Sequence, residues 1–159
     1  MSTENNKVQL CRFYEQAWNH KDFSVVDEIT DSNYVDHTPG SPPGLPPRPE
    51  GFKQLMSGYL AAFPDLQITV EDVIAEADKV AVRWTAQRTQ TGSLMGISPT
   101  GKSVTLTGIT FDHLRNGKVV EGWTNLDMLG MLQQLELPQH RVSLVRDLRI
   151  HLYRHPPLG

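Results

Sequence analysis

The sequence predicts an α+β fold in which helices pack on one face of an antiparallel sheet. Residues 80–127 hold three segments rich in β-branched and aromatic residues, as strands usually are: Val80–Gln90, Lys102–Leu114 and Lys118–Leu126. The pair Asn116-Gly117 between the last two is a strong hairpin signal, because both residues tolerate a positive φ. Helical patterns precede these strands, and helices followed by strands are the order of an α+β protein.

Length and composition indicate one domain of ordinary globular type. The chain has 159 residues, of which 38% are apolar and 21% charged. A net charge of −3 and the lack of a basic stripe argue against a nucleic-acid partner. Cys11 has no second cysteine to pair with, which fits a reducing compartment. The sequence begins with no leader pattern and holds no apolar run of membrane length, so we expect a cytoplasmic protein without a membrane partner.

The N-terminal part is predicted to be mainly helical. A first helix begins at Ser2 or Thr3 and is broken by Asn19–Asp22. A short second helix spans Phe23–Ile29, and Asn33–His37 is expected to be extended. These elements would cover one face of the sheet.

A proline-rich segment, Thr38–Glu50, follows and holds six prolines and two glycines. Proline lacks a backbone donor, so this segment belongs to neither a helix nor a sheet interior. A linker is one interpretation, and a loop across the mouth of a cavity is the one we favour. Glu50–Phe63 then has the clearest helical pattern, and Leu66–Ala77 alternates as a fourth strand.

The C-terminal part contains a short helix and a tail. Asp127 is expected to cap a helix over Met128–Leu135. We assign residues 1–137 to the domain and residues 138–159 to a tail. The arginines of this tail and the helical spacing of its apolar residues allow two interpretations: an amphipathic helix docked on the domain or on a partner, or a disordered end.

Several sequence pieces together resemble one family. They are RFYEQAWN, YVDH, GFKQLMSGYLAAFPDLQITVEDVIAEADKVAVRW, the loop ending in GISPTGK, GITFDHLRNGKVVEGW and LDMLGMLQQL. Over about Lys7–Leu137 the chain resembles the SnoaL-like polyketide cyclases, also called ester cyclases. The resemblance implies a cone-shaped α+β barrel of the nuclear-transport-factor type. Its curved sheet wraps around the helices and leaves a pocket at the open end, and the common state is a homodimer.

The resemblance also implies a chemistry that needs no metal and no cofactor. In these cyclases a buried aspartate on the last strand removes the acidic proton between two carbonyls of a polyketide ester, and the enolate closes a ring. That strand usually carries His-Trp-Asp, whereas this chain has Gly122-Trp123-Thr124. Thr124 therefore occupies the position of the base, although its hydroxyl cannot act as one. The resemblance implies that Thr124 faces the pocket, and strand alternation would then direct Asp127 away from it.

His37 is the best remaining candidate for acid–base work, because its side chain titrates near neutrality. Asp36 beside it is either catalytic or a residue that orients the loop. A surface histidine is the alternative for His37, and a solvated strand edge is the preferred interpretation of His113. Residues that could line a pocket for a flat apolar ligand, or else form plain core, are Tyr14, Trp18, Tyr34, Met56, Tyr59, Phe63, Trp84, Thr110 and Phe111.

Three functions compete at this point. The first is an enzyme that acts on a small aromatic or polyketide-like ester. The second is a non-catalytic module that binds a small apolar ligand, or a hydroxylation-related relative. The third is a domain that binds a protein partner through the outer face of the sheet. No spacing of His, Cys or carboxylates indicates a metal site, and no phosphate-binding loop is present.

Overall fold

The computed structural model describes residues 2–136 apart from residues 40–43, 45, 47–48 and 95. The predicted tail, residues 138–159, lies outside the described residues. In chain order the elements are α1 (Thr3–Arg12), the π-helical η1 (Phe13–Asn19), α2 (Ser24–Ile29), β1 (Thr30–Asp36), α3 (Glu50–Ala62), β2 (Gln67–Glu76), β3 (Lys79–Thr89), β4 (Ser103–Arg115), β5 (Lys118–Leu126) and α4 (Met128–Gln134). The predicted α+β order is confirmed.

The five strands form one open, curved sheet in the order β1-β5-β4-β3-β2. The four predicted strands pair antiparallel as expected. The extended segment expected at Asn33–His37 belongs to a fifth strand, β1, which joins the edge of β5 in the parallel direction. Its pairing continues past the strand end, where the His37 amide donates to the Gly122 carbonyl at 2.9 Å. Since β1 and β2 remain edges, the sheet does not close into a barrel.

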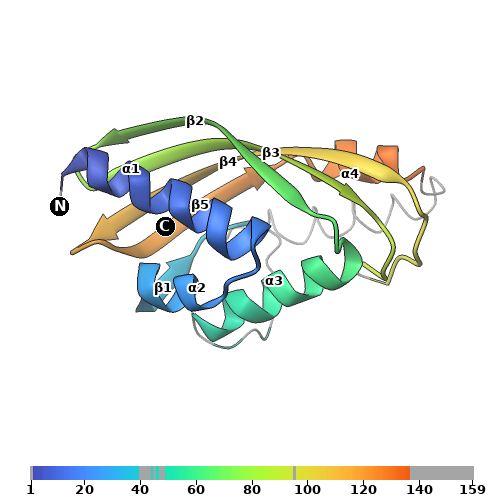
Figure 1. The fold of residues 1–159 in the computed structure, drawn as a ribbon, viewed down its shortest axis with the longest axis horizontal. Coiled ribbons are helices and arrows are strands. Elements are labelled where there is room, and N and C mark those ends of the chain that lie inside the picture. Colours follow the sequence, from blue (N-terminus) through green and yellow to red (C-terminus); the bar gives the residue numbers. More distant parts are fainter. Residues whose placement is uncertain (1, 40–43, 45, 47–48, 95, 137–159) are drawn as a thin grey trace, which may run out of the picture.

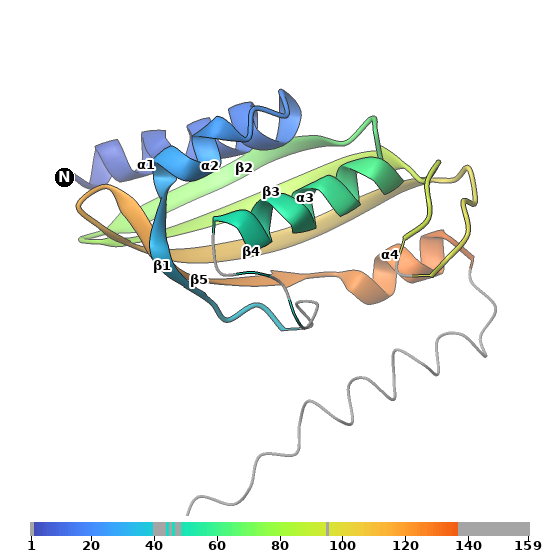
Figure 2. The same cartoon turned by 90° about the horizontal axis from the view of Figure 1, so that it is seen from below.

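The helices α1, α2 and α3 lie on the concave side of the sheet (Figures 1 and 2). The predicted α3 crosses this concavity, and Met56 of α3 is fully buried there, as is Phe63 just after it. Phe52 on α3 stacks on Phe13 of η1 with ring centroids 5.7 Å apart. Apolar burial therefore joins α3 to the N-terminal helices as well as to the sheet.

The β4–β5 hairpin forms at Asn116 and Gly117, as predicted, and both have positive φ values of 52° and 79°. The pairing of β4 with β5 shifts by one residue close to this turn. Leu114 pairs with Val119, but His113 pairs with Glu121, so Val120 is an extra residue on β5. This β-bulge moves every later side chain of β5 to the opposite face from the one that an unbulged hairpin would give.

Two local predictions at the helix ends are also confirmed. The first helical stretch ends at Asn19, and Lys21 beyond it has a φ of 61°. Asp127 caps α4, since its carboxylate accepts a hydrogen bond from the Gly130 amide at 2.9 Å. Among the described residues, no helix is both long and apolar enough to cross a membrane.

Candidate functional site

The concave face of the sheet carries a small group of polar side chains inside an apolar interior. Along β4 the even-numbered residues from Val104 to Leu114 face this side, because they alternate with exposed or half-exposed odd-numbered ones. Thr110 and Asp112 belong to the even-numbered set. On β5 the bulge brings Gly122 opposite Asp112 and Thr124 opposite Thr110. The site therefore lies on two neighbouring strands.

Hydrogen bonds to threonine hydroxyls connect four elements across this face: β3, β4, β5 and η1. The Trp84 indole Nε1 donates to Thr110 Oγ1 at 3.1 Å, and the Oγ1 atoms of Thr110 and Thr124 lie 3.2 Å apart. Tyr14 of η1 hydrogen-bonds Thr110 as well. Thr124 thus faces the concave interior, on the same side as Thr110. Its backbone amide donates to Thr38 Oγ1 at 3.2 Å, which ties β5 to the start of the proline-rich segment.

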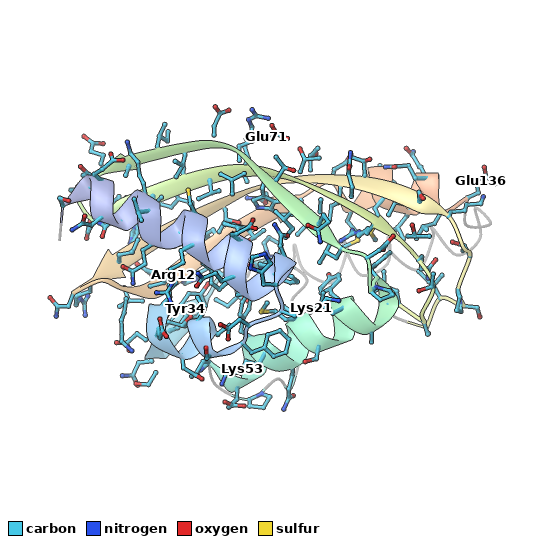
Figure 3. All side chains as sticks on the ribbon, in the orientation of Figure 1. Arg12, Lys21, Tyr34, Lys53, Glu71 and Glu136 are labelled. Atoms are coloured by element: carbon cyan, nitrogen blue, oxygen red, sulfur yellow. The ribbon has the colours of Figure 1, made fainter. Side chains whose placement is uncertain are left out.

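Asp112 is a buried carboxylate of this interior, and it was not among the residues predicted for the site. It is only 5% exposed. A Cβ added to Gly122 would lie 2.4 Å from Asp112 Oδ1 and 2.6 Å from the Tyr34 hydroxyl, so these two oxygens share the space that glycine leaves. Figure 3 labels Tyr34 on the helix-covered side of β1. The alternation of Val104, Leu106 and Leu114 on β4 was the signal that could have found Asp112.

The electrostatics of this group keep one phenol neutral. Burial raises the pKa of Tyr14 well above its ordinary value, and the nearby charge of Asp112 raises it further. The Tyr14 hydroxyl therefore stays protonated at neutral pH and can donate a hydrogen bond. A buried carboxylate beside neutral hydroxyl donors is an arrangement suited to moving a proton and stabilising an oxyanion.

His37 does not join this group, because it lies on the convex face. Its ring stacks on Trp123 with centroids 4.5 Å apart, and its Nε2 lies 3.1 Å from Glu121 Oε2. His113 reaches the same carboxylate from β4, with Nδ1 2.7 Å from Glu121 Oε1. The hydrogen bond from His37, followed by that from His113, lowers the pKa of Glu121. The sheet therefore separates His37 from Thr124.

Asp36 has a local structural role in this arrangement. Its Oδ1 accepts a hydrogen bond from the Thr38 amide at 3.0 Å, which orients the chain where it leaves β1. The loop-orienting alternative thus has direct support, and the structure does not bring Asp36 together with Thr124 through any described contact. Whether Asp36 acts in catalysis stays a prediction.

The expected pocket-lining residues divide between the two faces. Tyr14, Met56, Phe63 and Trp84 are buried in the interior, while Trp18, Tyr34 and Tyr59 are partly buried and pack against the same core. Phe111 was placed wrongly. It is an odd-numbered residue of β4 and is 37% exposed on the convex face, with its ring 6.0 Å from that of Trp123.

Two hollows open among the described residues. One, of about 450 Å³, lies between η1 and β2 and is lined in part by Tyr14, Asn19 and Ile68. The other, of about 600 Å³, lies beside the β4–β5 hairpin and is lined in part by Asn33 and Arg115. Of these two hollows, only the first is lined by one of the concave-face polar residues, namely Tyr14. Within the described residues, no group of three His, Cys, Asp or Glu side chains is placed to hold a metal ion.

The sequence and the structure of this chain are similar to those of one protein family. Residues 8–135 match the family model described as SnoaL-like polyketide cyclase. The crystal structure of IdmH from Streptomyces antibioticus, a proposed polyketide cyclase, is 33% identical with a TM-score of 0.73. That alignment covers 83% of this chain and 99% of IdmH. No curated protein matches the chain.

Two further solved structures are similar. AclR from Streptomyces galilaeus, a proposed hydroxylase, is 33% identical with a TM-score of 0.73 over 86% of this chain and 89% of its own. TsrD from Streptomyces laurentii has a TM-score of 0.76 at 23% identity, over 85% of this chain and 97% of its own, and this likeness shows the fold alone. The cone-type fold expected from the resemblance is thereby confirmed, with an open sheet.

Proposed function

The chain belongs to the SnoaL-like polyketide cyclase family, and from this premise we propose that it acts on a small aromatic or polyketide-like ester by acid–base chemistry on the concave face of its sheet. The observation that carries this proposal is the buried Asp112. The resemblance puts the family's base at Thr124, which cannot ionise. Asp112 enters the same face from the neighbouring strand, two residues along from the partner of Thr124. We therefore assign it the role of the missing base.

The reaction balances without an oxidant or reductant. The Asp112 carboxylate takes the proton from the carbon between two carbonyl groups, and the electron pair of that C–H bond becomes an enolate. The enolate carbon attacks a carbonyl carbon of the same molecule, so a C–C bond forms and the C=O π bond opens to an alkoxide. The proton held by Asp112 then passes to this alkoxide. The neutral Tyr14 hydroxyl can donate a hydrogen bond to the charged oxygen as it develops.

Thr124 and Thr110 orient the ligand in this scheme. Their hydroxyls are 3.2 Å apart and Trp84 donates to one of them, so the pair is held in place by its neighbours. A fixed hydroxyl pair offers both donors and acceptors to carbonyl oxygens. Holding the ligand in its reactive conformation lowers the barrier, because the entropy of orientation is lost on binding rather than in the reaction.

The test is hydrogen–deuterium exchange of an aromatic β-keto ester, ethyl benzoylacetate, followed by NMR at mildly acidic pD where the uncatalysed exchange is slow. We expect the protein to accelerate exchange and Asp112→Asn to lower the acceleration by about 100-fold or more, as loss of a general base does. Asp72→Asn is the matched control, because Asp72 is exposed and pairs with Arg83. His37→Asn tests the alternative base on the convex face.

The outcomes separate the candidate functions. Equal exchange by wild type and Asp112→Asn contradicts the assignment, and loss with His37→Asn alone would transfer the role to His37. The second candidate is a non-catalytic module for a small apolar ligand, which Thr124 at the usual base position favours. Binding of the ester without accelerated exchange would support that function.

Assembly and location are further parts of the proposal. The convex face exposes Ile109 at 52%, Val35 at 50% and Phe111 at 37%, which supports a homodimer built on this face. Analytical ultracentrifugation tests it. The cytoplasm as location and a small apolar or aromatic ligand as partner stay predictions.

A further inference from the structure

Arg88 on β3 is a buried cation that has no counter-charge among the described residues. It is 6% exposed and faces the concave side, as the even-numbered residues of β3 do. Its Nη2 donates to the Met131 sulfur at 2.8 Å, and its guanidinium carbon lies 4.4 Å from the centre of the Phe63 ring. Its Nε is buried and has no hydrogen-bond partner in the part of the chain that the structure describes. Within the described part of the chain, no carboxylate forms an ion pair with Arg88.

The contacts of Arg88 with Met131 and Phe63 do not replace the hydrogen bonds to water that its guanidinium loses on burial. A thioether sulfur is a weak acceptor, and an aromatic face neutralises no charge. Burial lowers the pKa of Arg88 to about 10, so the side chain is still charged at neutral pH. Arg83 on the same strand shows the contrast. It lies on the convex side, is exposed, and its Nε donates to Asp72 at 2.7 Å.

We propose that Arg88 binds a carboxylate of the ligand that occupies the concave face. A guanidinium presents a rigid fork of N–H donors that matches a carboxylate with two parallel hydrogen bonds. This inference rests on the proposed function, since it names the class of ligand for the same site. The ligand is an elongated aromatic or polyketide-like carboxylic acid, whose ester or ketone end carries the reacting carbon.

The position of Arg88 sets the orientation of this ligand. Trp84 lies four residues earlier on the same face, about 13 Å away along an extended strand. Asp112 pairs with Val80, which is a further four residues along. Arg88 and the strand position opposite Asp112 are therefore about 26 Å apart along the strand, so only a long ligand can place its carboxylate at Arg88 and its reacting carbon at Asp112, with the Trp84 ring between them.

The experiment compares 2-naphthoate with its methyl ester, which has the same rings and no charge. Binding is measured by isothermal titration calorimetry on the full chain. We expect the acid to bind wild type at least tenfold more tightly than the ester. Arg88→Met, which keeps side-chain length without charge, should abolish this difference, whereas the matched control Arg83→Met should keep it. Equal affinities of acid and ester for wild type overturn the proposal, as does an unchanged preference in Arg88→Met.

Two further arms keep the result decisive. If Arg88→Met does not fold, thermal melting of wild type with acid or ester gives the same comparison, because tighter binding raises the melting temperature more. Acetate distinguishes a free anion from the carboxylate of a larger ligand, and acetate binding as tight as that of naphthoate overturns the assignment. Asp112→Asn should keep the acid preference, so failure of the proton-transfer scheme and failure of the Arg88 site are seen separately.

Discussion

Replacement of Gly122 by alanine tests the geometry of the interior. The new Cβ would lie 2.4 Å from Asp112 Oδ1 and 2.6 Å from the Tyr34 hydroxyl, about 1 Å closer than ordinary contact. Overpacking of this kind costs roughly 1–3 kcal/mol, while removal of a strand glycine gains about 0.5–1 kcal/mol through backbone entropy. We expect a net loss of about 1–2 kcal/mol in the free energy of unfolding.

Urea unfolding followed by tryptophan fluorescence measures this loss, which should lower the midpoint by roughly 0.5–1 M. Gly58→Ala is the matched control, because Gly58 lies within α3 and a Cβ added there would have no atom within 4 Å. It should gain about 0.5–1 kcal/mol. Adding Tyr34→Phe to Gly122→Ala removes one crowded oxygen and should restore part of the loss. A Gly122→Ala protein as stable as wild type refutes the proposed crowding at Asp112.

Two more predictions concern single contacts. Asp127→Ala removes the cap of α4 and should lower the free energy of unfolding by about 1 kcal/mol in the same urea assay, and an unchanged midpoint would contradict the capping role. Because its histidine partners lower the pKa of Glu121 below its ordinary value near 4.5, this group stabilises the fold above that value and ceases to do so as pH falls through the lowered pKa. The melting temperature of wild type should therefore fall more steeply below that pH than that of Glu121→Gln, and parallel melting curves would disprove it.

The polar interior offers a way to compare members of this family. The resemblance places a carboxylate at the position of Thr124, whereas this chain buries one at Asp112 on the adjacent strand. Antiparallel neighbours on one face lie close enough for either strand to present a group to the same ligand atom. The residue opposite Asp112 is glycine, and a side chain there would collide with the carboxylate. A carboxylate at position 112 therefore requires a glycine at position 122.

Local sequence signals determined much of the fold. The Asn116-Gly117 hairpin, the break after Asn19 and the Asp127 cap depend on residues close in the chain, so their chemistry was readable directly. The apolar stripe of α3 predicted a buried helix for the same reason. The inward direction of Thr124 was expected from the resemblance and not from alternation, because the bulge at Val120 reverses the alternation counted from the hairpin.

Tertiary structure decided the features that depend on distant pairing. The parallel contact of β1 with β5 joins segments more than 80 residues apart and carries His37 to the convex face, where it meets Glu121. The extra residue Val120 fixes which side chains of β5 face Asp112, and no turn signal in the sequence announces it. Arg88 was not singled out from the sequence, because its burial depends on Phe63, which follows α3, and on Met131 of α4. Sequence periodicity gives the two faces of each strand, but only the packed sheet determines which face becomes the interior and which groups meet there.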